Sequence, residues 1–169
     1  VVLRRLAECV TAAFPVVFVL GFPIVGSLLA GTDDLYYWSH HDAHDPATLA
    51  SAGPGADGQP VLMNRHYVEA GRRIVLGFVE PHFMAGYSGG RKVIAPGVAH
   101  QDTITTFHSA RFMSHPKADN CVLDGNPLHE EQLAIVSMLG GALALNTVID
   151  DRRRLAFVNF GEVVQSHLR

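Results

Sequence analysis

The sequence predicts a single α/β domain, spanning 1–169, with a mainly parallel sheet flanked by helices in a Rossmann-like layer. Apolar runs of strand length alternate with segments that carry helix-capping signals, as in α/β proteins. One run, "RIVLGFVE" at 73–80, is apolar from Ile74 to Val79, which is typical of a strand buried on both faces of a parallel sheet. The 169 residues, 48% of them hydrophobic, are enough for one domain with its own core.

The N-terminal part is expected to form a helix at 1–13, a strand at 16–20 and a second strand at 34–38. An uncharged run at 12–31 has the length of a membrane span or of a signal peptide. Four helix breakers divide this run into shorter pieces: Pro15, Gly21, Pro23 and Gly26. A buried strand followed by turns and a short helix is therefore favoured over a signal-like segment and over a membrane span.

The middle of the chain is expected to alternate helices, turns and strands. Pro46 should start a short helix over 46–53, followed by a turn-rich connector at 53–60. The strand at 73–80 then leads directly into a glycine-rich loop. A helix is predicted at 102–113, with Asp102 as its N-cap.

The C-terminal part has the clearest helix signals. A helix is predicted at 126–140 because Pro127 lies in its first turn, acidic residues follow, and a glycine ends it. Two strands, at 142–150 and 154–160, flank a charged turn, and a last helix is expected at 161–169.

Composition excludes some classes of function. The net charge of −3 argues against a nucleic-acid partner. The two cysteines, Cys9 and Cys121, lie far apart and form no CxxC motif, so a disulfide framework is not expected. This fits a reducing compartment and predicts a cytoplasmic protein.

The loop "EPHFMAGYSGGRKVIAPG" at 80–97 is the strongest functional signal. A glycine-rich turn between a buried strand and a helix is the usual ligand position in an α/β sheet, because its backbone N–H groups can approach an anion. The loop is not a GxxxxGK[ST] motif, since Val93 stands where a hydroxyl would hold magnesium. Lys92 is one of only two lysines, against eleven arginines, which suggests that its amine matters as well as its charge. The alternative is a structural turn with a solvated Arg-Lys pair.

Histidines gather around this loop and in one other segment. His82 follows the strand and is a candidate for proton transfer near neutral pH. His108 lies 16 residues after Lys92 and could return to the loop as a metal ligand, although a helical histidine is more often a packed or surface residue. The run "HHDAHD" at 40–45 could bind a metal, but a solvated loop explains it as readily.

Together the motifs "FVEPHFMAGYSGGRKVIAPGVA", a trailing histidine, "MSHPKADNCVLDGNPLHEEQ" and "LNTVIDDRRRLAFVNFGEVVQSH" resemble the nickel-dependent lactate racemase family. The resemblance covers roughly 39–169, whereas 1–38 match poorly. It implies a racemase or epimerase of 2-hydroxy acids that uses a nickel-pincer nucleotide. The family reaction moves a hydride from the substrate Cα to the cofactor ring and returns it to the other face.

The resemblance also implies residue roles. Lys92 would carry the cofactor through a covalent thioamide, which an amine can form and a guanidinium cannot. His108 would be the nickel ligand, and His82 one of two acid/base histidines. The residues expected to hold the cofactor, with the glycines and the serine at its phosphate, are Gly86, Ser88, Gly89, Gly90 and Arg91. The expected partners are a small 2-hydroxy acid and the proteins that make the cofactor.

The chain departs from the family pattern in its N-terminal part. The D-H-T-R-P and G-T-H-R-P motifs, which supply the substrate arginine and the second histidine, are absent, and the chain reads "GTDDLYYWSHH" instead. The family's C-terminal domain is also unmatched, so the sequence resembles the central part of a family member. A cofactor-binding module without turnover is therefore the first alternative, and a metal-dependent hydrolase that uses the histidine clusters is the second.

Overall fold

The computed structural model of the chain describes residues 17–20 and 40–169. The predicted strand at 16–20 is confirmed as β1, Val17–Leu20. The predictions of a helix at 1–13 and a strand at 34–38 lie outside the described residues, as does most of the apolar run at 12–31. Within the described part of the chain, every helix is too short or too polar to cross a membrane.

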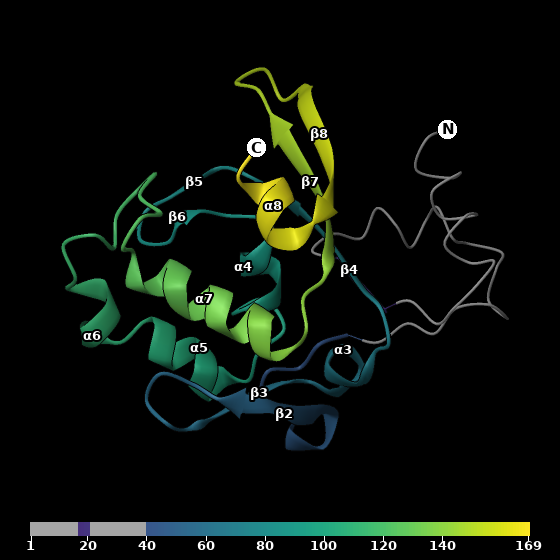
Figure 1. The fold of residues 1–169 in the computed structure, drawn as a ribbon, viewed down its shortest axis with the longest axis vertical. Helices are drawn as coiled ribbons and strands as arrows, with labels where there is room; N and C mark the ends of the chain where they lie inside the picture. Colours follow the sequence, from purple (N-terminus) through teal and green to yellow (C-terminus); the bar gives the residue numbers. More distant parts are fainter. Residues whose placement is uncertain (1–16, 21–39) are drawn as a thin grey trace, which may run out of the picture.

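The main sheet has the strand order β1-β4-β7-β8 (Figure 1). β4 is Arg73–Phe78, β7 is Leu143–Ile149 and β8 is Leu155–Glu162. β4 runs parallel to both β1 and β7, whereas β7 and β8 pair antiparallel. The α/β class is thus confirmed, but the sheet is mixed, and the expectation of a mainly parallel sheet is not confirmed.

The antiparallel edge follows from the turn between β7 and β8. Asp150 accepts hydrogen bonds from the backbone N–H groups of Arg152 and Arg154, at 3.0 and 2.8 Å, and binds the Arg154 guanidinium. This closes the chain on itself within a few residues. A parallel pairing would need a crossover connection of a dozen or more residues.

The prediction of a helix at 46–53 is wrong beyond its first turn. A short 3-10 turn, Pro46–Thr48, leads into β2, Leu49–Pro54, which pairs antiparallel with β3, Pro60–Asn64. The segment expected to be a connector is the hairpin turn, in which Gly58 N–H donates to the Gly55 carbonyl at 2.9 Å. Pairing with β3 therefore overrides a sequence that looks helical.

The predicted helix at 102–113 is two helices, α5, Gln101–Phe107, and α6, Ala110–Met113. His100, and not Asp102, is the N-cap of α5, because its Nδ1 accepts the N–H of Asp102 at 3.2 Å. The helix ends because Ser109 has an extended backbone, with φ −71° and ψ 156°.

The C-terminal helix predictions are largely confirmed. α7, Pro127–Met138, starts as predicted, and the side chain of Asn126 caps it by accepting the N–H groups of Leu128 and His129. The last helix, α8, is shorter than expected and spans Val163–His167, because β8 continues through Glu162, which caps α8. A further short helix, α3, spans Arg65–Glu69.

The glycine-rich loop forms a hairpin with strands of two residues each, followed by one helical turn. The hairpin strands are β5, Pro81–His82, and β6, Gly86–Tyr87, and the turn is α4, Arg91–Ile94. Figure 1 shows α4 beneath α8 and beside β4, so the loop lies at the carboxyl end of β4.

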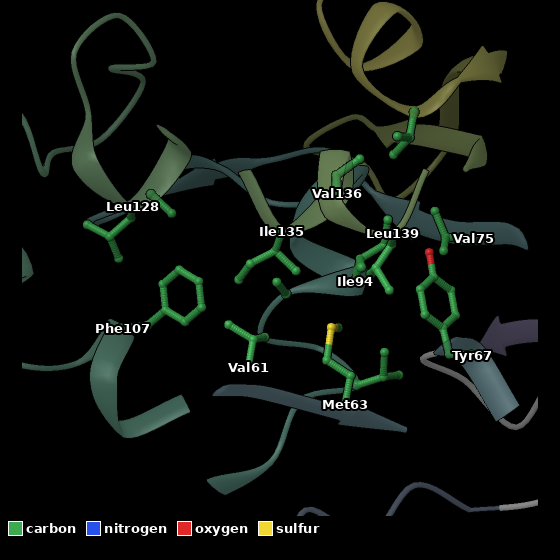
Figure 2. Close-up of a cluster of buried hydrophobic side chains, with 14 of the residues drawn as sticks. Val61, Met63, Tyr67, Val75, Ile94, Phe107, Leu128, Ile135, Val136 and Leu139 are labelled. Atoms are coloured by element: carbon green, nitrogen blue, oxygen red, sulfur yellow. The ribbon is translucent and has the colours of Figure 1, made fainter. Parts of the chain in front are cut away.

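A hydrophobic core fixes the position of α4. Side chains from β3, α3, α5 and α7 converge in this core (Figure 2), and Ile94 of α4 is 1% exposed within it. The labelled members are Val61, Met63, Tyr67, Val75, Ile94, Phe107, Leu128, Ile135, Val136 and Leu139. Burial of Ile94 therefore anchors the helical turn that carries Lys92.

Candidate functional site

The loop after β4 folds back onto the end of that strand. The Ser88 hydroxyl donates to the Phe78 carbonyl at 2.8 Å and accepts the Glu80 N–H at 3.0 Å. The Ser88 N–H also donates to the Glu80 carbonyl at 2.9 Å. The hydroxyl predicted to hold a phosphate is thus engaged in closing the loop.

The glycines allow this close packing. Gly89 has a φ of +71°, and a Cβ there would lie 2.6 Å from the Phe78 carbonyl oxygen. Gly86 has a φ of +75°, and a Cβ there would lie 2.4 Å from the Val122 oxygen. Both positions need a residue without a side chain.

Several loop N–H groups bind protein acceptors. Gly90 N–H donates to Asn146 Oδ1 at 3.1 Å, and Gly86 N–H donates to the Asp119 carbonyl at 3.2 Å. In the part of the chain that the structure describes, the N–H groups of Gly89 and Arg91 have no such acceptor. These two are the amides of the Gly-Gly-Arg turn that a ligand could use.

Arg91 is buried inside the loop, with 1% of its surface exposed. Its Nη2 donates to the carbonyls of Ala85 and Tyr87, at 2.9 and 3.4 Å. Its Nη1 lies 3.0 Å from Nε2 and 3.2 Å from Nδ1 of His167. Burial lowers the pKa of Arg91 to about 10. The guanidinium is directed at the protein, so its predicted role as a cofactor contact stays a prediction.

Below Arg91, His129 of α7 is buried with its Nδ1 unbonded among the described residues. Burial, followed by the charges of Arg91 and His167, lowers the pKa of His129 to about 4. The folded protein therefore prefers neutral His129, and this contribution to stability is complete above the ordinary pKa of 6.5 and is lost as the pH falls toward 4.

We expect His129→Gln to reduce the acid sensitivity of the fold. The free energy of unfolding of the parent should fall by about 1–3 kcal/mol more than that of the variant between pH 7 and pH 4. Urea unfolding at several pH values measures this difference, with exposed His115→Gln as the matched control. Equal pH dependence in parent and His129→Gln would contradict the expectation.

Lys92 follows Arg91 on α4 and is half-buried. Burial, and next the charge of Arg91, lower the pKa of its amine, and Glu80 opposes them. A lowered pKa increases the fraction of uncharged amine, which is the nucleophilic form.

His82 lies at the end of β5 and stacks on Phe83, with ring centroids 4.8 Å apart. Its Nδ1 accepts the N–H groups of Met84 and Ala85, at 3.4 and 3.2 Å. The proton of the neutral ring therefore resides on Nε2, and His82 presents a donor to the site.

His108 caps the C-terminus of α5 and is exposed. Its Nδ1 lies 2.7 Å from the Ile104 carbonyl oxygen, which can only accept, so Nδ1 carries the proton. The lone pair of neutral His108 is then on Nε2. A ring nitrogen bonded to a backbone carbonyl while the other nitrogen is free is the usual arrangement of a histidine that ligates a metal.

The structure brings His82, Lys92 and His108 into one neighbourhood. After burial, the charges of Lys92, His108 and Arg91 lower the pKa of His82, which requires that these groups lie near its ring. The charged groups of Lys92 and His108 thus lie close enough to His82 to act on its ring.

This neighbourhood predicts an electrostatic response. In Lys92→Met, we expect the pKa of His82 to rise, because a nearby positive charge has been removed. An NMR titration of the imidazole signals measures the change, and Lys117→Met is the control. An unchanged His82 titration in Lys92→Met would show that the two groups do not lie together.

The segment at 40–45 does not join this site as a metal cluster. His41 Nε2 lies 2.9 Å from the Ala99 carbonyl oxygen, and the carboxylates of Asp42 and Asp45 accept backbone N–H groups. Across residues 17–20 and 40–169, no three His, Cys, Asp or Glu side chains are grouped to hold a metal ion.

Two residues that support the loop were missed from the sequence. Asn146 of β7 accepts from Gly90 through Oδ1, and its Nδ2 donates to Ser166 Oγ at 3.1 Å. His167 of α8 contacts Arg91 and lies 2.8 Å from the Ser88 carbonyl through Nε2. A polar Asn146 within the apolar run "LALNTVI" was the one available signal.

Comparisons with known proteins identify the family of the chain. The sequence model of the lactate racemase N-terminal domain matches residues 26–120. The chain is similar to the lactate racemase of Thermoanaerobacterium thermosaccharolyticum, with 34% identity over 129 residues, which are 76% of this chain and 30% of that protein. It is also similar to the lactate racemase of Lactiplantibacillus plantarum, with 32% identity over 75% of this chain and 30% of that protein.

Two solved structures have a fold similar to that of this chain. The lactate racemase apoprotein of T. thermosaccharolyticum superposes with a TM-score of 0.73 at 34% identity, over 76% of this chain and 31% of that chain. A protein from Thermotoga maritima shares the fold, with a TM-score of 0.64 at 23% identity, over 78% of this chain and 36% of that chain. The chain spans about 30% of the length of the curated relatives. The domain match and the solved fold together show that the chain belongs to the lactate racemase N-terminal domain family.

Proposed function

We propose that this chain is the cofactor-bearing part of a 2-hydroxy-acid racemase of the lactate type, which acts through a nickel-pincer nucleotide attached to Lys92. Two curated relatives, 34% and 32% identical to the chain, are lactate racemases. The loop that carries Lys92 lies at the carboxyl end of a central strand, where ligands bind in α/β sheets.

The observation that carries this proposal is the hydrogen bond of His108. Because Nδ1–H is held by the Ile104 carbonyl at 2.7 Å, the ring direction is fixed and Nε2 is available as a single protein ligand. A lone histidine suits a metal whose other donors come from the cofactor itself. It does not suit a hydrolytic metal site, which needs about three protein ligands.

Lys92 would hold the cofactor through its amine. Its lowered pKa favours the uncharged nucleophile, and the N–H groups of Gly89 and Arg91 are available beside it for the cofactor's anionic groups. When bound, the cofactor would accept a hydride from the substrate Cα and return it. His82 would then serve one face of the substrate. Because its Nδ1 accepts backbone N–H groups, the neutral ring presents Nε2–H as a donor, and taking the hydroxyl proton at Nε2 would require the other tautomer, with Nδ1 released from the backbone.

The second candidate is a module that binds the cofactor without turnover. It is favoured by the sequence, in which the G-T-H-R-P motif that would supply a second acid/base histidine is replaced by "GTDDLYYWSHH". In either case, we expect cytoplasmic cofactor-making proteins as partners, and a 2-hydroxy acid as the substrate of the complete enzyme.

Co-expression with the cofactor-making enzymes tests the proposal. The intact mass of the parent should increase by that of one cofactor, and nickel should approach one atom per chain. Lys92→Arg keeps the charge but removes the amine nucleophile, so it should show no mass increase, whereas Lys117→Arg should behave as the parent. An unmodified, nickel-free parent would refute the proposal.

A further inference from the structure

We propose that Arg91 and His167 form an internal clamp that positions Lys92, and that neither side chain contacts the cofactor. This inference rests on the proposed function in one respect, namely that Lys92 is positioned to bind the cofactor. The clamp is formed by the way α4, α8 and β7 pack around the glycine-rich loop.

Arg91 is the centre of the clamp. Its side chain is directed into the protein, while the adjacent Lys92 is half-buried at the surface of the same helical turn. Among the described residues no carboxylate pairs with Arg91; its charge meets the carbonyl oxygens of Ala85 and Tyr87, at 2.9 and 3.4 Å, and the ring of His167. Burial of an arginine without a counter-ion is unfavourable, so this position is not explained by stability alone.

His167 closes the clamp from the other end of the chain. Its Nε2 lies 2.8 Å from the Ser88 carbonyl oxygen, which can only accept, so Nε2 carries the proton. Arg91 Nη1 lies 3.0 Å from Nε2 and 3.2 Å from Nδ1, and in this tautomer Nδ1 holds the lone pair that can accept from it. The ring also covers Gly90, where a Cβ would lie 2.7 Å from His167 Cδ2. One side chain therefore touches three loop positions, 88, 90 and 91.

Hydrogen bonds from the main sheet hold the same Gly-Gly-Arg turn from a second direction. Asn146 accepts the N–H of Gly90 at 3.1 Å and donates to Ser166 Oγ at 3.1 Å, and Asn159 donates to the Ser166 carbonyl at 2.8 Å. α8 is thus fixed to β7 and β8 at the residue that precedes His167. Gly90 is thus held by Asn146 of β7, and Arg91 by His167 of α8. Lys92 is the next residue in the chain.

The clamp predicts that α8 controls the environment of the Lys92 amine. We propose to label the 169-residue chain with trace acetic anhydride at a series of pH values and to quantify both lysines by peptide mass spectrometry. Lys117 is the internal reference, because it is exposed and bonded to the Asp124 carbonyl away from the loop. No cofactor is needed, so the result is independent of whether the cofactor is ever bound.

In His167→Ala, the midpoint of the Lys92 labelling profile should rise and its rate relative to Lys117 should change at least about twofold, because loss of the clamp exposes the amine to water. His167→Gln retains an N–H donor and an oxygen acceptor, so it should restore the parent profile. Val61→Ala, a core change on β3, should lower the unfolding temperature without moving Lys92. A role of His167 in stability alone predicts that His167→Ala and Val61→Ala behave alike.

Ser166→Ala provides the second route if His167→Ala does not fold. It removes the hydroxyl that Asn146 binds, so hydrogen exchange of the Gly90 amide should accelerate and the Lys92 midpoint should rise in part. Parent-like labelling in every folded variant would overturn the clamp while leaving the proposed function intact. A working clamp in a chain that never acquires cofactor would instead refute the proposed function alone.

Discussion

D-lactate incubated with the cofactor-loaded 169-residue chain is expected to remain D-lactate. Racemisation needs proton transfer at two opposed faces of the substrate carbon, and His82 serves only one of them. Loss of a positioned acid or base costs about 10²–10⁴ in rate. The absent D-H-T-R-P motif removes the arginine that would orient the carboxylate, which adds to the loss.

His41 is the obvious substitute for the missing histidine, and its contacts argue against it. Its Nε2 is engaged with the Ala99 carbonyl oxygen at 2.9 Å, so the ring is tied to the start of α5. Chiral chromatography of lactate after incubation measures the conversion, with His82→Ala as the control. Clear formation of L-lactate by the parent and none by His82→Ala would show that the chain is a complete racemase.

His108→Ala is expected to lose nickel while keeping the covalent modification. The nickel content should fall at least about tenfold, because the variant lacks the single protein ligand and the second-shell bond that orients it. Lys92 is unchanged in this variant, so the intact mass should still include the organic part of the cofactor. Elemental analysis and intact mass of the same sample separate the two effects.

The matched control for His108→Ala is His115→Ala, which removes another exposed histidine. The control should retain nickel at the parent level. Full nickel content in His108→Ala would contradict the ligand role and indicate that the metal is held elsewhere.

The sequence predicted those elements whose signals are local. The strand at 73–80 was identified by its uninterrupted apolar run, and α7 by Asn126 and Pro127 at its start. The β2–β3 hairpin was missed because "PATLASAG" has few β-branched residues, and its strand forms only by pairing with β3. The break after His108 was missed because "FHSARF" is compatible with a continuous helix.

In the candidate site, too, the residues close together in sequence were predicted and the long-range contacts were missed. His82, Lys92 and His108 lie within one strand-loop-helix unit, so the sequence, together with the family resemblance, predicted that they converge. The contacts of Arg91 with His167 and of Gly90 with Asn146 join residues 76 and 56 positions apart. Such contacts depend on how α8 and β7 pack on the loop, and no local pattern encodes them.

Peptide mapping of the co-expressed protein should show directly whether Lys92 carries the cofactor. Digestion followed by tandem mass spectrometry should place the added mass on the side chain of Lys92 and leave Lys117 unmodified. The two lysines make the assignment unambiguous, because the chain contains no others. Added mass on Lys117, or nickel retained by a chain whose Lys92 is a free amine, would contradict the account.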